Sequence, residues 1–274
     1  MSILDEIAKR TCKRIDEAKK HAPLAAVRAA AEEQVAADKA KGTFGTFPFE
    51  AALRKASFGL ICEVKKASPS KGVIADKFDP LAIARDYEQA GADAISCLTE
   101  PFWFLGADDY LAAIAHELTT PVLRKDFTID EYMIYQAKAL GASAVLLICA
   151  ILDDAQLAAY SALAEELGLS ALVEAHDACE IDRALTCGAR IIGVNNRNLK
   201  DFSIDLDNAN SLRTMVPEEV LFVAESGVSC PADIATMAAA GADAALVGEA
   251  LMRSEAKAEL IASMRTAARE GRYA

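Results

Sequence analysis

Residues 61–72 place a carboxylate and three lysines where an apolar strand gives way to a loop. The run 58–64 is apolar apart from Glu63 near its end, and Lys65 follows two residues later. In an extended chain, residues two apart point to the same side, so Glu63 and Lys65 can face one site. A carboxylate inside an apolar strand is costly unless it is paired. We therefore interpret this strand end as part of a functional site, and not as an ordinary solvated lysine loop.

The second half of this stretch is predicted to be an irregular, mobile loop. Pro69 lacks a backbone donor, and Gly72 permits a turn. Few apolar side chains hold the loop down, so we expect it to order over an anionic substrate that Lys66 and Lys71 contact. The alternative is an ordered loop held by ion pairs to neighbouring acidic loops.

A repeated pattern along the chain indicates what positions this strand end. Apolar, strand-like runs occur at residues 58–64, 94–98, 121–124, 144–149, 171–173, 190–194, 220–224 and 244–247. Helical stretches lie between them, and several end in a glycine where a left-handed residue is needed, at Gly91, Gly141, Gly188 and Gly241. Asp79 and Asp177 have the spacing of helix N-caps. Eight apolar strands separated by helices predict a parallel sheet covered on both faces.

The fold that fits this pattern is an α/β fold, a (β/α)8 TIM barrel in a single domain covering residues 1–274. A barrel of this kind typically takes about 250 residues. Residues 1–56 are predicted to be an N-terminal helical extension, with helices at 3–20, 24–40 and 49–56, packed outside the barrel or over its bottom. The alternative is an open doubly wound sheet, but no Gly-x-Gly-x-x-Gly follows the first strand.

The composition excludes several function classes. A net charge of −12 disfavours nucleic acid and anionic membranes as partners. The seven cysteines form no Cys-x-x-Cys pair, which predicts reduced thiols and a cytoplasmic location. The three histidines lack the spacing of metal ligands, and no signal peptide or membrane span is expected.

Polar side chains follow most of the predicted strands, and in a barrel these strand ends share one rim. They are Glu63, Lys65, Glu100, Lys125, Glu174, Asn195, Arg197, Glu225, Ser226 and Glu249. Carboxylates and lysines without a metal pattern predict acid–base chemistry on a carbonyl. Gly227 and Gly248 follow the last two strands, where barrels often bind phosphate through backbone N–H groups. The aromatic residues at 102–104 form either a wall for a planar substrate or an apolar plug against the outer helices.

Several of these segments together resemble the indole-3-glycerol-phosphate synthase family. They are CEVKKASPSKG at 62–72, LTEP at 98–101, PVLRKDF at 121–127, LVEAHD at 172–177, IGVNNRNL at 192–199, AESGV at 224–228 and LVGEALMR at 246–253. The resemblance implies a (β/α)8 barrel with an N-terminal extension, no cofactor, and an anionic, phosphorylated small-molecule substrate. The implied reaction closes the ring of 1-(2-carboxyphenylamino)-1-deoxyribulose 5-phosphate, with loss of carbon dioxide and water, in tryptophan biosynthesis.

The resemblance also implies roles for particular residues. Lys125 matches the general acid, and Glu174 matches the carboxylate that assists the dehydration. The supporting polar set is Glu63, Lys65 and Asn195. Substrate contacts are implied for Ser68, Phe127, Arg197, Glu225, Ser226, Gly227, Gly248 and Glu249, of which the last four form the phosphate loops. The segment 102–105 departs from the family pattern, so the wall of the aromatic pocket is not settled by it.

Three other functions stay open at the level of sequence. A related barrel isomerase would share the phosphate loops without needing the Glu63 and Lys65 strand end. A Schiff-base aldolase would use Lys125 covalently, and a binding scaffold would tolerate loss of the strand-end charges. The sequence is compatible with a monomer.

Overall fold

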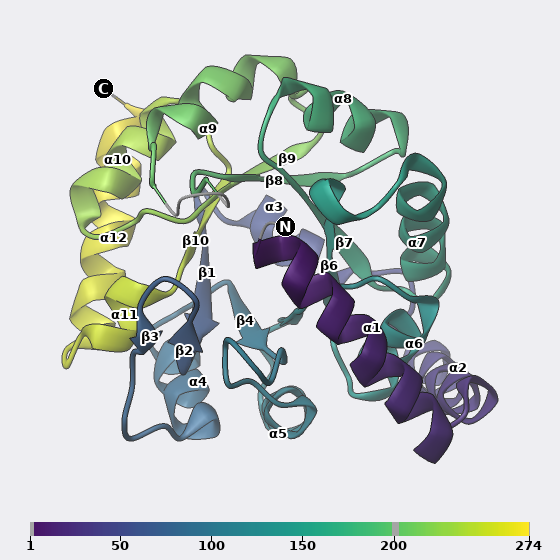
Figure 1. Cartoon of the computed structure of the whole chain (residues 1–274). Helices are drawn as coiled ribbons and strands as arrows, with labels where there is room; N and C mark the ends of the chain where they lie inside the picture. The colour runs from purple at the N-terminus through teal and green to yellow at the C-terminus, as the bar shows by residue number, and fades with distance from the viewer. Residues whose placement is uncertain (1–2, 199–202, 274) are drawn as a thin grey trace.

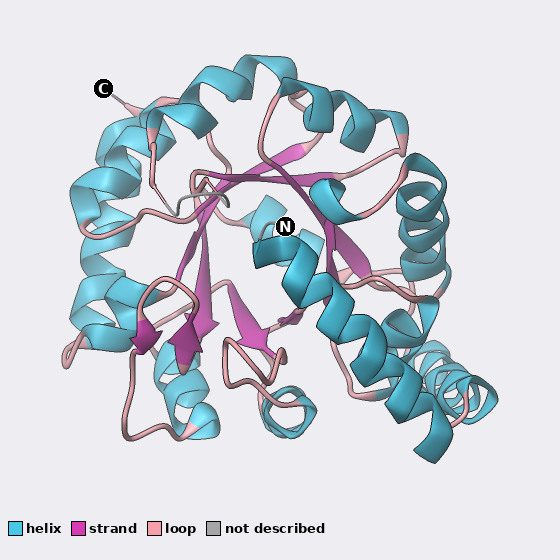
Figure 2. Ribbon diagram, viewed as in Figure 1, coloured by secondary structure: helices cyan, strands magenta, loops and turns pink. Residues whose placement is uncertain are grey.

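The computed structural model describes residues 3–198 and 203–273. Its centre is a closed barrel in which the strands are hydrogen-bonded in the order β1-β10-β9-β8-β7-β6-β5-β4. Figures 1 and 2 show this ring of strands surrounded by helices. Each strand pairs in parallel with the next barrel strand along the chain, and β10 closes the ring on β1. The predicted (β/α)8 barrel is confirmed.

The barrel strands agree with the predicted apolar runs to within two residues at either end. They are Gly59–Val64 (β1), Ala94–Leu98 (β4), Val122–Lys125 (β5), Ala144–Ile148 (β6), Ser170–Ala175 (β7), Ile191–Asn195 (β8), Leu221–Glu225 (β9) and Ala244–Val247 (β10).

The helices between the strands begin and end as the local residues dictate. They are Pro80–Gln89 (α4), Asp108–Glu117 (α5), Glu131–Ala139 (α6), Asp154–Glu166 (α7), Ala178–Thr186 (α8), Asp207–Leu212 (α9), Pro231–Ala239 (α10), Glu249–Arg253 (α11) and Lys257–Arg272 (α12), with 3-10 turns at Cys149–Ile151 (η1) and Arg213–Met215 (η2). Asp79 accepts a hydrogen bond from the Ala82 N–H at 3.0 Å and so caps α4, as predicted. Gly91, Gly141 and Gly241 have φ between 85° and 89°, the left-handed geometry that ends a helix.

Alternate residues of each strand point into the barrel and fill it. The inward apolar side chains are Ile61, Ala94, Leu123, Ala144, Leu146, Ile148, Leu172, Ile191, Leu221, Val223, Ala244 and Leu246. Phe49 and Leu53 join this cluster from below and close the bottom of the barrel. Because side chains alternate, the polar residues at the carboxyl ends of the strands continue the inward rows at the top.

The N-terminal extension consists of Ile3–His21 (α1), Leu24–Lys41 (α2) and Pro48–Lys55 (α3). The predicted placement is right for two of these helices, since α2 packs on α6 outside the barrel and α3 lies under its bottom. It is wrong for α1, which lies across the mouth of the barrel at its carboxyl end (Figure 1). A guanidinium on α1 explains this position, because Arg14 donates to Asp126 at the end of β5 at 2.8 Å.

The loop after β1 is more regular than predicted. Residues Ala67–Ser68 (β2) and Gly72–Val73 (β3) pair in antiparallel fashion and form a small hairpin. The left-handed φ of 64° at Gly72 allows the chain to turn back there. The Ala67 N–H also donates to the Phe104 carbonyl at 3.2 Å, which ties the hairpin to the loop after β4.

Candidate active site

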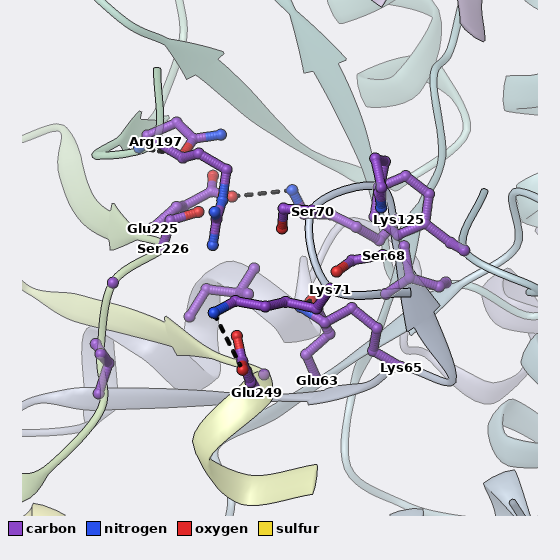
Figure 3. A pocket seen from close by; sticks show the side chains of 18 of the residues that line it. Glu63, Lys65, Ser68, Ser70, Lys71, Lys125, Arg197, Glu225, Ser226 and Glu249 are labelled. Atoms are coloured by element: carbon purple, nitrogen blue, oxygen red, sulfur yellow. Dashed lines mark hydrogen bonds and ion pairs between the residues drawn. The ribbon is translucent and has the colours of Figure 1, made fainter. Parts of the chain in front are cut away.

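A cavity of about 620 Å³ opens at the carboxyl end of the barrel. All thirteen residues predicted to form the site line it: Glu63, Lys65, Ser68, Lys125, Phe127, Glu174, Asn195, Arg197, Glu225, Ser226, Gly227, Gly248 and Glu249. Figure 3 shows Arg197, Glu225 and Ser226 on one side of the cavity and the loop carrying Ser68, Ser70 and Lys71 opposite them. The barrel therefore brings residues that are distant in the sequence to one place, while their roles remain predictions.

The floor of the cavity is an ammonium group held between two carboxylates. Lys125 Nζ donates to Glu225 Oε2 at 2.9 Å and to Glu174 Oε2 at 3.2 Å. The three side chains come from β5, β7 and β9, and both carboxylates are buried. One positive charge facing two buried negative charges leaves a net negative charge that the lysine alone does not neutralise.

This imbalance changes the protonation behaviour of all three groups. Burial alone would lower the pKa of Lys125, but Glu225 and Glu174 outweigh it, so the pKa of Lys125 is raised and the amine stays protonated. Burial and repulsion from Glu174 raise the pKa of Glu225 to about 7 despite the attraction of Lys125. Burial opposes ionisation of Glu174 as well, but Lys125 and His176 outweigh it and lower the pKa of Glu174. The pair of carboxylates is thus split into one group that stays ionised and one that takes up a proton near neutrality.

Glu63 and Lys65 form the next part of the wall, as their spacing predicted. Lys65 Nζ lies 3.1 Å from Glu63 Oε1, and Glu63 is buried. A Cβ atom at Gly248 would lie 2.7 Å from Lys65 Nζ and 2.9 Å from Glu63 Oε1. The glycine at the end of β10 therefore makes room for this ion pair.

Asn195 and Gly193 on β8 fit the carboxylates around them. Asn195 Nδ2 donates to Glu174 Oε1 at 3.1 Å. A Cβ at Gly193 would lie 2.1 Å from Glu225 Oε1, so only glycine leaves space for the Glu225 carboxylate inside the barrel. Sequence reasoning did not identify Gly193, because a glycine within a strand gives no sign of which neighbour occupies its space.

The loop after β9 has an unusual backbone. Ser226 and Gly227 both have positive φ, 66° and 90°. A serine in the left-handed region is uncommon and marks a backbone held in place by its surroundings. Asn196 Nδ2 supports the turn by donating to the Ser226 carbonyl at 3.2 Å. This loop and Gly248 border one side of the cavity.

Cations at the mouth flank these two loops. Lys71 Nζ lies 3.8 Å from Glu249 Oε1, and Arg253 Nε donates to the same oxygen at 3.0 Å (Figure 3 shows the first of these contacts). Arg253 lines the cavity but was not predicted. Lys66, in contrast, is not among the lining residues, and its ammonium lies 6.0 Å from the Phe78 ring centroid. Of the two loop lysines expected to contact substrate, only Lys71 faces the cavity.

The aromatic segment at 102–104 divides between the two predicted roles. Phe104 lines the cavity, and its ring centroid lies 6.0 Å from that of Phe127. Phe102 and Trp103 lie outside it, beneath α1, with the Arg10 guanidinium 3.8 Å from the Phe102 ring centroid. Trp103 is therefore packing, not a wall of the pocket.

Glu100 of the predicted rim, and Arg124 next to Lys125, have structural positions instead. Glu100 accepts the backbone N–H groups of Phe102, Trp103 and Phe104 and fixes their loop. Arg124 points outward from β5, since it alternates with Lys125, and donates to Asp108 on α5 at 2.7 Å.

Asp126 anchors α1 to the rim, a role that its sequence position did not reveal. Its carboxylate accepts hydrogen bonds from Arg14 at 2.8 Å, from Thr99 Oγ1 at 2.6 Å and from the Phe127 N–H at 2.8 Å. Burial opposes ionisation, but the Arg14 and Arg124 guanidinium groups outweigh it and lower the pKa of Asp126. Ile3, Leu4 and Ile7 of α1 consequently line the upper part of the cavity.

His176 is a second residue without a predicted role that the structure brings to the site. Its Nε2 lies 3.4 Å from Glu174 Oε1, and its Nδ1 lies 3.0 Å from Glu180 Oε2. The available signal for His176 was the capping pattern that begins at Asp177, because it placed Glu180 one helical turn beyond the end of the strand, close to His176.

The arrangement suits proton transfer inside a partly apolar cavity. Leu98, Leu146, Ile148 and Leu246 line it beside the charged groups. Within residues 3–198 and 203–273, no group of His, Cys, Asp and Glu side chains has the arrangement of a metal site, and no helix is long and apolar enough to cross a bilayer. Leu199, the last residue of one family-like segment, lies outside the described residues.

Comparisons with known proteins agree on one family. The family model for indole-3-glycerol phosphate synthase matches residues 4–264. The indole-3-glycerol phosphate synthase of Ruminiclostridium cellulolyticum is 48% identical over 266 residues, covering 97% of this chain and all of that protein. The enzyme of the same name from Lacticaseibacillus paracasei is 56% identical over 213 residues, covering 78% of this chain and 82% of that protein.

A solved structure of lower similarity shows the fold alone. The crystal structure of 3-hexulose-6-phosphate synthase from Salmonella typhimurium superposes with a TM-score of 0.62 at 16% sequence identity. The match covers 78% of this chain and all of that one.

Proposed function

The chain belongs to the indole-3-glycerol phosphate synthase family, and we propose that the cavity performs that family's decarboxylating ring closure with Lys125 as the proton donor. The substrate is 1-(2-carboxyphenylamino)-1-deoxyribulose 5-phosphate, and the product is indole-3-glycerol phosphate, an intermediate of tryptophan biosynthesis. The observation that carries the proposal is the Lys125 ammonium held at 2.9 Å and 3.2 Å by two buried carboxylates.

The first step joins the aromatic ring to the ribulose chain. The ring carbon that carries the carboxylate attacks the ketone carbon, and the ketone oxygen takes a proton from Lys125 Nζ. A developing alkoxide is a stronger base than an amine, so the raised pKa of Lys125 keeps the proton available without preventing its transfer. The same raised pKa disfavours the neutral amine that a Schiff-base mechanism needs.

Loss of carbon dioxide then restores the aromatic ring. The electron pair of the bond between ring and carboxylate returns to the ring, and no residue has to take up a proton in this step. An apolar surround favours the departure of a charged carboxylate as a neutral gas, because it solvates the carboxylate poorly. Phe104, Phe127, Leu146 and Ile148 supply such a surround.

Dehydration completes the indole. The new hydroxyl group leaves as water when it is protonated, and the adjacent CH₂ group loses a proton to form the ring double bond. Glu174, which stays ionised, accepts the proton, and a protonated group near neutrality returns one to the hydroxyl. Glu225, with a pKa of about 7, can supply that proton. Asn195 holds Glu174 in position, and the Glu63–Lys65 ion pair lines the same cavity.

The substrate phosphate is proposed to lie against the loops after β9 and β10. Ser226, Gly227, Gly248, Arg253 and Lys71 line the cavity, and we propose that the backbone N–H groups of the first three bind the phosphate. Arg197 and Ser68 also line the cavity, and we place the aromatic carboxylate end of the substrate near them. A cytoplasmic location is proposed on the seven free cysteines, and a monomer remains an expectation that size-exclusion chromatography tests.

The direct test is to follow indole fluorescence while the purified protein is mixed with the ribulose substrate. We expect an indole product, release of one carbon dioxide per turnover, and competition by inorganic phosphate. Lack of product would contradict the proposed reaction, and product without phosphate competition would contradict only the position of the phosphate.

A further inference from the structure

His176 links the site to the helix that follows β7. Its side chain is 18% exposed, but its Nε2 atom is buried and has no hydrogen-bond partner. That atom lies 3.4 Å from Glu174 Oε1, the oxygen that also accepts from Asn195, while Lys125 contacts the other oxygen. The imidazole therefore faces the side of Glu174 that Lys125 does not reach.

The other edge of the ring is held by Glu180 on α8. Glu180 Oε2 lies 3.0 Å from His176 Nδ1 and accepts the His176 backbone N–H at 2.8 Å. In a usual capping box this carboxylate would bond to the N-cap residue, Asp177. Here Asp177 caps Glu180 at 2.9 Å, but the reciprocal contact goes one residue earlier, to His176. Glu180 thus orients the His176 imidazole instead of completing a capping box with Asp177.

The charges that act most strongly on the ring are negative. Glu180 from α8, Glu174 from β7 and, at longer range, Glu225 from β9 face the imidazole. Burial alone would lower the pKa of His176, but these carboxylates outweigh it and raise the pKa. A protonated imidazole carries an N–H at each nitrogen, so it can donate to Glu180 through Nδ1 and is attracted to Glu174 through Nε2.

We propose that His176 is a positioning residue for Glu174, a cation that keeps this carboxylate ionised and oriented when Lys125 has given up its proton. The inference rests on the proposed function, in which Lys125 becomes neutral during ring closure and Glu174 acts afterwards. At that stage Lys125 no longer balances the charge of Glu174, and His176 is the remaining cation beside it. Proton transfer by Glu174 then depends on a residue that need not touch the substrate.

The first test measures the imidazole without any substrate. The chain has three histidines, so NMR titration of the ring Cε1–H signals resolves them, and His176→Gln identifies the signal of His176. We expect a pKa above the ordinary value of about 6.5, falling in both Glu174→Gln and Glu180→Gln, because each variant removes a negative neighbour. His116→Gln, at an exposed position on α5, is the matched control that should leave the His176 signal unchanged. An identical pKa of His176 in wild type and Glu174→Gln would overturn the proposal.

The second test measures steady-state kinetics. Removing a partner that orients a functional side chain typically costs about 10–100-fold, so we expect His176→Gln to lower kcat about tenfold with little change in KM. In the wild type, kcat should fall as pH rises through the pKa of His176. That fall should shift to lower pH in Glu180→Gln, which tests the idea independently if His176→Gln does not fold.

The outcomes separate the two proposals. A loss of thermal stability in both variants with unchanged kcat and pH profile would show that His176 only connects β7 to α8, and the inference would be wrong. If the wild type does not convert the ribulose substrate, the proposed function fails, whereas the NMR titration still reports whether His176 and Glu174 interact.

Discussion

Both ends of the barrel carry buried charges, but the two ends pair them differently. At the bottom, Glu50 on α3 accepts from Arg54 at 2.9 Å on one oxygen and from Arg190 at 2.8 Å on the other. At the top, Lys125 lies between two carboxylates, and Glu225 Oε1 is buried without a hydrogen-bond partner. Buried polar atoms are nearly always satisfied, so the carboxylates at the top are less completely paired than Glu50 at the bottom.

Carboxylates at the starts of the strands, which also lie at the bottom of the barrel, are paired in the same way as Glu50. Asp93 accepts the Leu60 backbone N–H at 2.8 Å and pairs with Arg265, and Asp243 accepts the Phe222 N–H at 2.8 Å. Each of these carboxylates fixes the beginning of a neighbouring strand. The same residue types therefore stabilise the fold at one end and are available for chemistry at the other, as in barrel enzymes generally.

The largest effect is expected at the centre of the top. Lys125→Ala should lower kcat by about 10²–10⁴-fold while substrate still binds, because general acid catalysis contributes that much. Lys125→Arg should not restore activity, since a guanidinium does not give up its proton. Lys55→Ala, an exposed lysine on α3 at the bottom, is the matched control. Steady-state kinetics by indole fluorescence measures all three, and near-normal turnover in Lys125→Ala would remove it from the mechanism.

A second prediction concerns stability and pH. The folded pKa of Glu225, about 7, lies above its ordinary value of 4.5, so the folded state holds this proton more tightly than the unfolded state does. Stability from this group is therefore present below pH 4.5 and is lost as pH rises toward 7, by on the order of 3 kcal/mol. Glu225→Gln should gain stability relative to wild type between pH 5 and pH 8.

Urea unfolding at the two pH values measures this difference and removes any constant packing effect of the substitution. A stability difference that is the same at pH 5 and pH 8 would show that Glu225 is ionised across this range.

The third prediction tests the space at Gly248. Gly248→Val should displace Lys65 and Glu63, because even the Cβ atom of the new side chain would lie within 2.9 Å of both side chains. We expect KM for the phosphorylated substrate to rise about tenfold, equivalent to about 1.4 kcal/mol of binding. Gly91→Val, at a helix end away from the cavity, is strained by its φ of 85° and should lower stability without raising KM. A normal KM would place the phosphate elsewhere.

The smallest effect is expected at the bottom. Glu50→Gln weakens two ion pairs whose arginines are 35% and 42% exposed, so it should cost only about 1 kcal/mol of unfolding free energy. Its kcat should equal that of wild type. A large loss of kcat from this substitution would mean that the two ends are coupled, and the division of roles drawn above would be wrong.

The sequence was sufficient for the fold because the repeated apolar runs and terminal glycines are local signals. It also identified Glu63, Lys125, Glu174 and Glu225 as residues that share one cavity, since all four lie at the ends of apolar strands, whereas their acid–base roles remain a proposal. It did not locate α1, whose position depends on the pairing of Arg14 with Asp126, a contact between residues 112 apart. Nor did it assign His176 or Gly193, because their importance comes from neighbours on other elements.

Closure of the barrel by β1 and β10 has a consequence for how the protein is made. A chain leaves the ribosome N-terminus first, so β1 waits through the synthesis of about 180 residues before its partner Ala244–Val247 emerges. Until then β1 has one unpaired edge, which in a nascent chain is a template for wrong pairing. The contact between Lys125 and Glu225 also forms late, because Glu225 follows Lys125 by 100 residues. A chain that stops before β9 can therefore contain folded helices and strands. It lacks Glu225, however, so Lys125 cannot lie between its two carboxylates.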